Sequence, residues 1–192
     1  MFITFLEIVD LLVMTGVLAY IFMDILPSPA RARDPLEMFT KKKKQSFEQF
    51  IFAAGVVATG IVLHELAHKF VAIALGQDAV FHASYKFLAL GVLLKLIHFP
   101  VLFFVPGYVS IIGASSPFEH AITAFAGPFM HLLLFGIAWL MLSQKALTPK
   151  KPEMRMFLAL TKRINLWLFI LNMLPIPGFD GFGVFSSIFA MI

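Results

Sequence analysis

Long runs of apolar residues restrict the folds open to this sequence. Three runs, Phe2–Leu26, Phe47–Leu75 and Ala121–Ser143, are each long enough for a bilayer-spanning helix, which needs roughly 20 residues. Hydrophobic residues make up 60% of the chain and charged residues 14%, whereas soluble domains average about 25% charged residues. We therefore predict an all-α polytopic membrane protein, a single domain over residues 1–192 with about four to six transmembrane helices.

The first run, Phe2–Leu26, is expected to remain in the protein as an accessory N-terminal helix over residues 1–26, ahead of a core over 47–183. No small-residue cleavage site follows it, so it does not resemble a signal peptide. It carries three acidic residues, which we expect to reach the membrane interface: Glu7, Asp10 and Asp24.

The region near 79–114 departs from the helical period. In the stretch AVFHASYKF apolar and polar residues alternate, which favours a strand. Pro106 and Gly107 lie between two β-prone runs and predict a hairpin turn. Such backbone survives at membrane depth only where protein or a watery cavity satisfies it. We expect a membrane-embedded β-like segment here; the alternative is a plain helix over Leu88–Phe104.

Basic residues mark one side of the predicted bundle. The net charge of +4 suits anionic lipid head groups better than nucleic acid. If the spans alternate, loops 27–46 and 144–163 share a side, and the positive-inside rule places that side in the cytoplasm. These loops contain Arg31, Arg33, Lys41–Lys44, Lys145, Lys150, Lys151, Arg155, Lys162 and Arg163. The other side is expected to contain only Lys69, Lys86 and Lys95.

Ionisable residues interrupt the second apolar run at His64-Glu65-Leu66-Ala67-His68. Charged groups in a membrane helix cost about 2.5–3.5 kcal/mol each on insertion scales, which favours a functional role. Two histidines one turn apart share a helix face and can bind one zinc ion, with the glutamate beside it. The chain has no cysteine, so any metal site must use histidine and carboxylate ligands.

A third ligand must come from elsewhere, since catalytic zinc usually keeps three protein ligands and one open position. The downstream candidates are Glu119, Glu153 and Asp180. Glu153 is expected in an exposed basic loop, and Glu119 at the start of a span. Asp180 follows a proline-broken apolar helix and precedes Gly181, which favours it. Its alternative role is that of an N-cap for the next helix.

These residues together resemble the site-2 protease family of intramembrane zinc metalloproteases, in its archaeal form. The resemblance rests on the HELAH motif at His64–His68, on Gly127-Pro128 opening a span, and on NMLP leading to Asp180-Gly181. It covers roughly residues 47–183. It implies one Zn²⁺ per chain bound by His64, His68 and Asp180.

The resemblance further implies that Glu65 is the general base acting on a zinc-bound water, and that Asn172 lies near the site to hold the substrate backbone or the oxyanion. It implies transmembrane protein substrates and a site near the cytoplasmic face. The charge-based orientation would instead place the site near the outer face. We favour the orientation that the resemblance implies. One departure is His131, where the family commonly has asparagine. It is interpreted as a tolerated polar exchange, an altered substrate contact or a sign of reduced activity.

The sequence thus predicts a zinc metalloendopeptidase in the cell membrane that cleaves transmembrane helices, in contact with the lipid bilayer and not with nucleic acid. The alternative is a catalytically weak relative that acts as a membrane scaffold. Metal transport is weaker, because no polar stripe follows several spans. Three histidines match no motif and are expected to have packing or interfacial roles: His82, His98 and His120.

Overall fold

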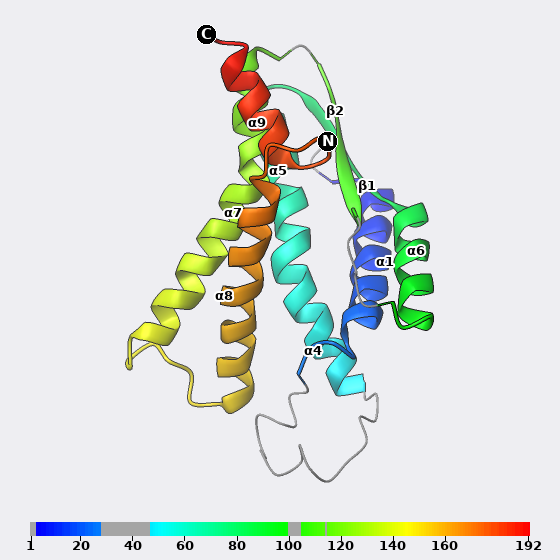
Figure 1. Cartoon of the computed structure of the whole chain (residues 1–192), viewed down its shortest axis with the longest axis vertical. Coiled ribbons are helices and arrows are strands. Elements are labelled where there is room, and N and C mark those ends of the chain that lie inside the picture. The colour runs from blue at the N-terminus through cyan, green and yellow to red at the C-terminus, as the bar shows by residue number, and fades with distance from the viewer. Residues whose placement is uncertain (1–2, 28–46, 100–104, 114) are drawn as a thin grey trace.

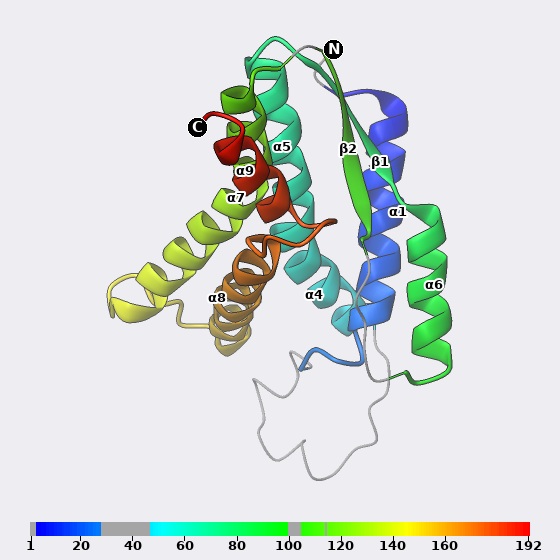
Figure 2. The ribbon, with the colours of Figure 1, turned by 45° about the horizontal axis from the view of Figure 1, so that its top comes forward.

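A computed structural model describes residues 3–27, 47–99, 105–113 and 115–192. Several of the basic positions discussed above, Arg31, Arg33 and Lys41–Lys44, lie outside the described residues. The described chain is mostly helical, as predicted, with one small sheet. Figures 1 and 2 show α7 and α8 on one side, α4 and α5 in the middle, and the sheet with α1 and α6 on the other side.

Three described helical segments are long and apolar enough to cross a membrane: Phe5–Phe22, Phe47–Ala74 and Pro117–Ser143. The first is α1 (Phe5–Phe22), whose N-terminus is stabilised by a capping box between Thr4 and Glu7. The last is α7 (Pro117–Ser143). The structure therefore confirms the predicted helical fold, with three helices among the described residues that could span a membrane.

The second span consists of α4 (Phe47–Val57), a π-helical turn (Ala58–Val62) and α5 (Leu63–Ala74). Within it the Thr59 hydroxyl donates a 2.7 Å hydrogen bond to the Gly55 carbonyl, a back-bond that often bends helices. π-helical turns inside α-helices frequently occur at functional sites. This one ends directly before the helix that carries His64.

Two more helices complete the bundle. Helix α8 (Pro152–Asn172) returns antiparallel to α7, and α9 (Asp180–Phe189) follows after a turn. The packing of α7 against both α8 and α9 joins the C-terminal half of the chain to α5. This arrangement brings the start of α9 beside the start of α5, although the two are far apart in sequence (Figure 2).

A two-stranded antiparallel sheet forms where the β-like segment was predicted. Strand β1 (Asp78–Ala83) pairs with β2 (Gly107–Ile112), and Asp78 lies opposite Ile112. The predicted hairpin turn at Pro106-Gly107 is wrong, because Gly107 begins β2 and helix α6 (Tyr85–Leu96) lies between the strands in sequence. Alternation of polarity identifies strands, but it does not show which strands pair.

Acidic residues of α1 cover the outer edge of β1. Phe81 donates its backbone N–H to Glu7 Oε1 at 2.7 Å, and Ala83 donates to Asp10 Oδ2 at 3.1 Å. An unpaired strand edge is a template for further strand pairing unless something covers it. Within the described residues, the outer edge of β1 is therefore covered, and the outer edge of β2 is the one open to pairing with a further strand.

The expectation that Glu7 reaches the membrane interface is wrong. Its side chain is 2% exposed and pairs with Lys69, which is 1% exposed, at 2.5 Å between Nζ and Oε1. Lys69 also donates a 2.6 Å hydrogen bond to the Ala79 carbonyl. Because buried charges need partners, this pair links α1, α5 and β1. Lys69 is consequently not one of the loop charges that determine membrane orientation.

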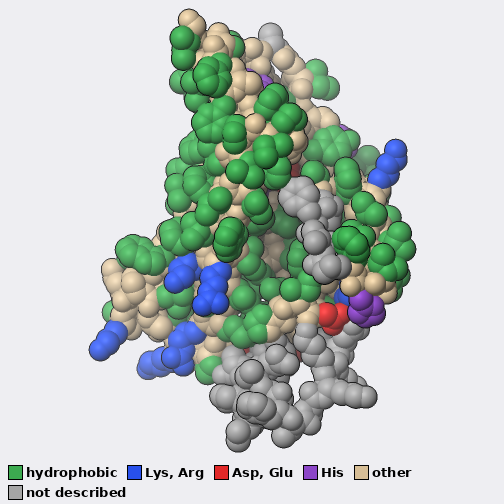
Figure 3. All heavy atoms as spheres, in the orientation of Figure 1, with side chains coloured by type: hydrophobic (Ala, Val, Ile, Leu, Met, Phe, Trp, Pro, Cys, Tyr) green, Lys and Arg blue, Asp and Glu red, His purple; other side chains and the backbone are tan. Residues whose placement is uncertain are grey.

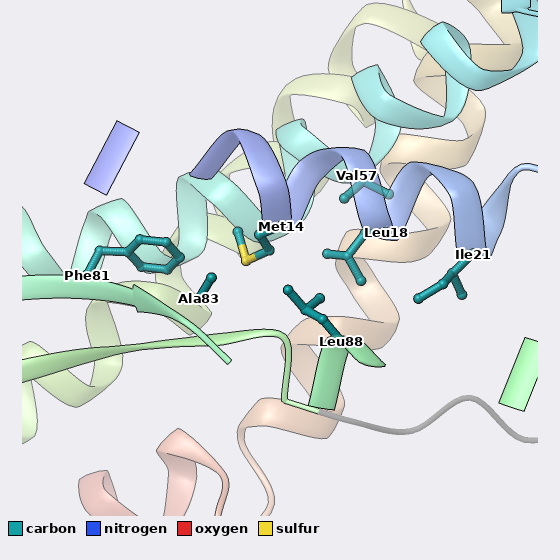
Figure 4. Close-up of a cluster of buried hydrophobic side chains, with 7 residues drawn as sticks. All are labelled: Met14, Leu18, Ile21, Val57, Phe81, Ala83 and Leu88. Carbon is teal, nitrogen blue, oxygen red and sulfur yellow. The ribbon is translucent and has the colours of Figure 1, made fainter. Parts of the chain in front are cut away.

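The main apolar cluster lies between α1, the sheet and α6. Figure 4 shows its buried side chains: Met14, Leu18, Ile21, Val57, Phe81, Ala83 and Leu88. On the outer surface hydrophobic side chains cover most of the face seen in Figure 3, and Lys and Arg side chains gather near one end. Lys95 Nζ lies 2.9 Å from the carboxylate of Asp24, which follows the C-terminus of α1. Lys95 was predicted to lie on the side of the bundle opposite loop 27–46. That prediction is wrong, because Asp24 lies at the end of α1 that leads into this loop.

Candidate metal centre

Helix α5 places His64 and His68 one turn apart on the same face, both less than 10% exposed. Their Nε2 atoms lie 3.1 Å apart. Asp180, the first residue of α9, brings its Oδ2 to 3.1 Å from His64 Nε2 and 3.4 Å from His68 Nε2. The structure thus brings together the three predicted ligands, which form a group able to hold a metal ion.

The triangle of these three atoms fits a zinc ion. Ligand atoms bound tetrahedrally at about 2.0–2.1 Å lie about 3.3 Å from one another, close to the observed edges of 3.1, 3.1 and 3.4 Å. Asp180 Oδ2 is buried and makes no hydrogen bond of good geometry with any described residue. A histidine–histidine–carboxylate set is also a recognised zinc ligand set. The residues present therefore fit the metal that the sequence predicts.

Helix α7 supports both histidines from one side. His68 Nδ1 lies 2.7 Å from the Thr123 carbonyl, so it donates its N–H there and leaves Nε2 free as a ligand. A Cβ added at Gly127 would lie 2.5 Å from His64 Cε1 and closer still to His68 Nε2. Only glycine fits at this contact, which gives a physical reason for the glycine of the Gly-Pro motif.

Two glycines allow the turn that presents Asp180. Gly178 has a φ of +99°, a conformation that favours glycine. A Cβ at Gly181 would lie 2.5 Å from the Met173 carbonyl oxygen, so α9 begins against the end of α8. The alternative role of Asp180 as an N-cap is wrong, because Phe179 holds that position and no side chain caps the helix.

A cavity of about 510 Å³ opens at the three ligands. Glu65, which is 8% exposed, and Asn172, the last residue of α8, both line it. Residues 105–109 at the start of β2 and Ile111 also line it. The cavity is thus bounded both by the candidate metal-binding group and by the open strand β2.

The remaining carboxylate candidates are not part of this group. Glu119 accepts hydrogen bonds from the backbone N–H and the hydroxyl of Ser116, 2.7 and 3.0 Å away, in the capping box of α7. Glu153 lies in the first turn of α8. Among the described residues, the group that could hold a metal ion consists of His64, His68 and Asp180.

His131 is buried beside the site at 2% exposure, and its ring stacks on that of His64. Its Nδ1 lies 2.8 Å from Asn165 Oδ1. Sequence reasoning missed Asn165, although an asparagine inside an apolar helix is a usable signal for a buried polar contact. Of the other histidines, His120 lies 2.7 Å from the Ser187 hydroxyl and lines the cavity, while His82 packs against Tyr108 across the sheet.

The chain is similar to a protein from Methanocaldococcus jannaschii named putative zinc metalloprotease MJ0611. The two are 36% identical over 134 residues, which cover 69% of this chain and 68% of the relative. No family model matches the chain. No solved structure matches it either.

Proposed function

The chain belongs to the zinc metalloprotease family of MJ0611, and from this premise we propose that it is an intramembrane protease of the site-2 type that hydrolyses peptide bonds of transmembrane helices. The observation that carries the proposal is the triangle formed by the buried His64 and His68 with the half-buried Asp180, on helices that line one cavity. Three apolar helices long enough to cross a bilayer support its place in a membrane.

The proposed roles follow from the positions of the side chains. His64, His68 and Asp180 would hold one zinc ion, which supplies Lewis-acid chemistry by polarising a carbonyl and acidifying water. Glu65 follows His64 directly and lines the cavity, so it is placed to take a proton from the attacking water and deliver it to the leaving amine. Asn172 lines the same cavity and offers an amide to the substrate backbone or the developing oxyanion.

A transmembrane helix must unwind before its backbone can be attacked, because its carbonyls are hydrogen-bonded. The outer edge of β2 is suited to receive the unwound segment by strand addition. Gly107 and Tyr108 of β2 line the cavity together with Glu65. With the outer edge of β1 covered by Glu7 and Asp10, an added strand would lie on the cavity side of the sheet.

The proposal is tested by cleavage of a synthetic transmembrane helix in detergent. Glu65→Gln is expected to reduce the rate about 10²–10⁴-fold, because the general base is lost while the ligands remain. Glu153→Gln makes the same chemical change outside the cavity and is the control, with the wild-type rate expected. Equal rates for wild type and Glu65→Gln would refute the protease proposal. Zinc binding without cleavage of any presented helix would instead support the scaffold alternative.

A further inference from the structure

The two histidine ligands are supported in different ways. His68 donates its Nδ1–H to the Thr123 carbonyl at 2.7 Å, the kind of outer hydrogen bond that fixes the ring of most zinc-ligating histidines. His64 Nδ1 is buried, and within the described parts of the chain it has no hydrogen-bond partner. Within these parts of the chain, the contact that can orient the Nδ1 side of the His64 ring is therefore a packing contact.

That contact is the ring of His131. The two ring centroids are 4.6 Å apart and the planes differ by 30°, a stacked arrangement, whereas His64 meets His68 nearly edge-on at 83°. His131 lies one turn after Gly127 on α7, so the two share a face. A Cβ at Gly127 would lie 2.7 Å from His64 Nδ1. The backbone of α7 thus approaches one part of the His64 ring, and His131 covers its plane.

His131 is itself held in place by α8. The amide nitrogen of Asn165 donates a 2.9 Å hydrogen bond to the Thr161 carbonyl, so its Oδ1 is the atom that accepts from His131 Nδ1 at 2.8 Å. His131, Asn165 and Thr161 are exposed by 2%, 1% and 4%. A buried chain of contacts therefore runs from the α8 backbone to the plane of the His131 ring.

We propose that His131 is a positioning residue that fixes the ring of the metal ligand His64 by stacking, in place of the hydrogen bond that fixes His68. The inference rests on the proposed zinc site. It assigns a role to His131, which stands where the family commonly has asparagine. The flat His131 ring limits rotation of the His64 ring, and Asn165 in turn limits rotation of the His131 ring.

The test compares His131→Phe with His131→Leu. Both remove the donor to Asn165 Oδ1, so that loss cancels in the comparison, and only phenylalanine keeps a flat ring against His64. Each purified protein is loaded with zinc, and release to a chelating dye is followed. His131→Leu is expected to release zinc about 10–100-fold faster than His131→Phe. Loss of a contact that supports a zinc ligand usually weakens metal binding by about this factor.

Equal release rates for the phenylalanine and leucine variants would overturn the inference. If either variant fails to fold, His131→Gln keeps a polar partner for Asn165 but has no ring, and its cobalt(II) absorption spectrum is compared with that of the wild type. A shifted spectrum is expected, and an unchanged one would overturn the inference. Failure of the proposed function looks different, because the wild type itself would then bind no zinc or show no dependence on Glu65.

Discussion

Two clusters of ionisable side chains, most of them buried, meet at consecutive positions of α5. His68 belongs to the group with His64 and Asp180, and Lys69 belongs to the pair with Glu7. Both clusters lie in an otherwise apolar part of the chain, where unpaired charges are costly. They differ in how far the protein itself satisfies them, and that difference separates a structural cluster from a functional one.

The Glu7–Lys69 cluster is satisfied by the protein alone. Lys69 bonds the Glu7 carboxylate and the Ala79 carbonyl. Glu7 also accepts from the backbone N–H groups of Phe81 and Thr4, at 2.7 and 2.8 Å. Donors meet acceptors throughout, so the cluster needs no ligand. Its effect is to fix α1 and β1 against the helix that carries the histidines.

In the histidine cluster, in contrast, hydrogen-bond acceptor atoms of different side chains face one another. With its Nδ1–H donated to Thr123, His68 has a lone pair at Nε2. That atom lies 3.4 Å from the carboxylate oxygen of Asp180, which makes no good hydrogen bond within the described chain. A bound cation would satisfy these atoms together. The difference between the clusters therefore supports the second one as the proposed metal site.

Breaking the satisfied cluster should affect stability and not zinc. Lys69→Met leaves the buried Glu7 carboxylate without its counter-charge, and we expect a loss of about 3–5 kcal/mol in the free energy of unfolding. It is measured by SDS titration of the helical circular-dichroism signal. The double variant Glu7→Gln/Lys69→Met should recover much of the loss, because glutamine can still accept from Phe81. A double variant as unstable as the single one would contradict this explanation.

Crowding the histidine cluster should affect zinc and not the rest of the fold. Gly127→Ala brings a Cβ within 2.5 Å of His64 Cε1, and we expect the zinc affinity to fall about 100-fold, or about 2.7 kcal/mol. Gly136→Ala on the same helix is the control, since a Cβ there meets nothing within 4 Å. Zinc titration with a competing dye compares the two. Equal affinities would show that α7 does not press on the ligands as described.

Local patterns predicted much of this fold and of its site. The apolar runs gave the three spans, because helix length and hydropathy are properties of contiguous residues. The HELAH spacing identified two ligands on one helix for the same reason. Asp180 was favoured by the proline-broken helix before it and by Gly181 after it, but no local pattern shows that the start of α9 lies beside α5.

Long-range pairings other than that of Asp180 with the two histidines were not predicted. Glu7 and Lys69 are brought together across α1 and α5, and their opposite charges in two apolar runs were the available signal. The pairing of β1 with β2 across α6 was likewise hidden, because alternation describes each strand alone. The contact between His131 and Asn165 depends on the packing of α7 on α8. In each case tertiary packing chose the partner.

The most direct test of the account is the metal content of the folded protein. Wild type purified with zinc and freed of loosely bound metal should contain about one zinc per chain, and Asp180→Asn should contain almost none. The Glu7→Gln/Lys69→Met variant, altered in the other cluster, should keep the wild-type content. Folded wild type without zinc, or equal zinc in wild type and Asp180→Asn, would contradict the claim that this cluster is a zinc site.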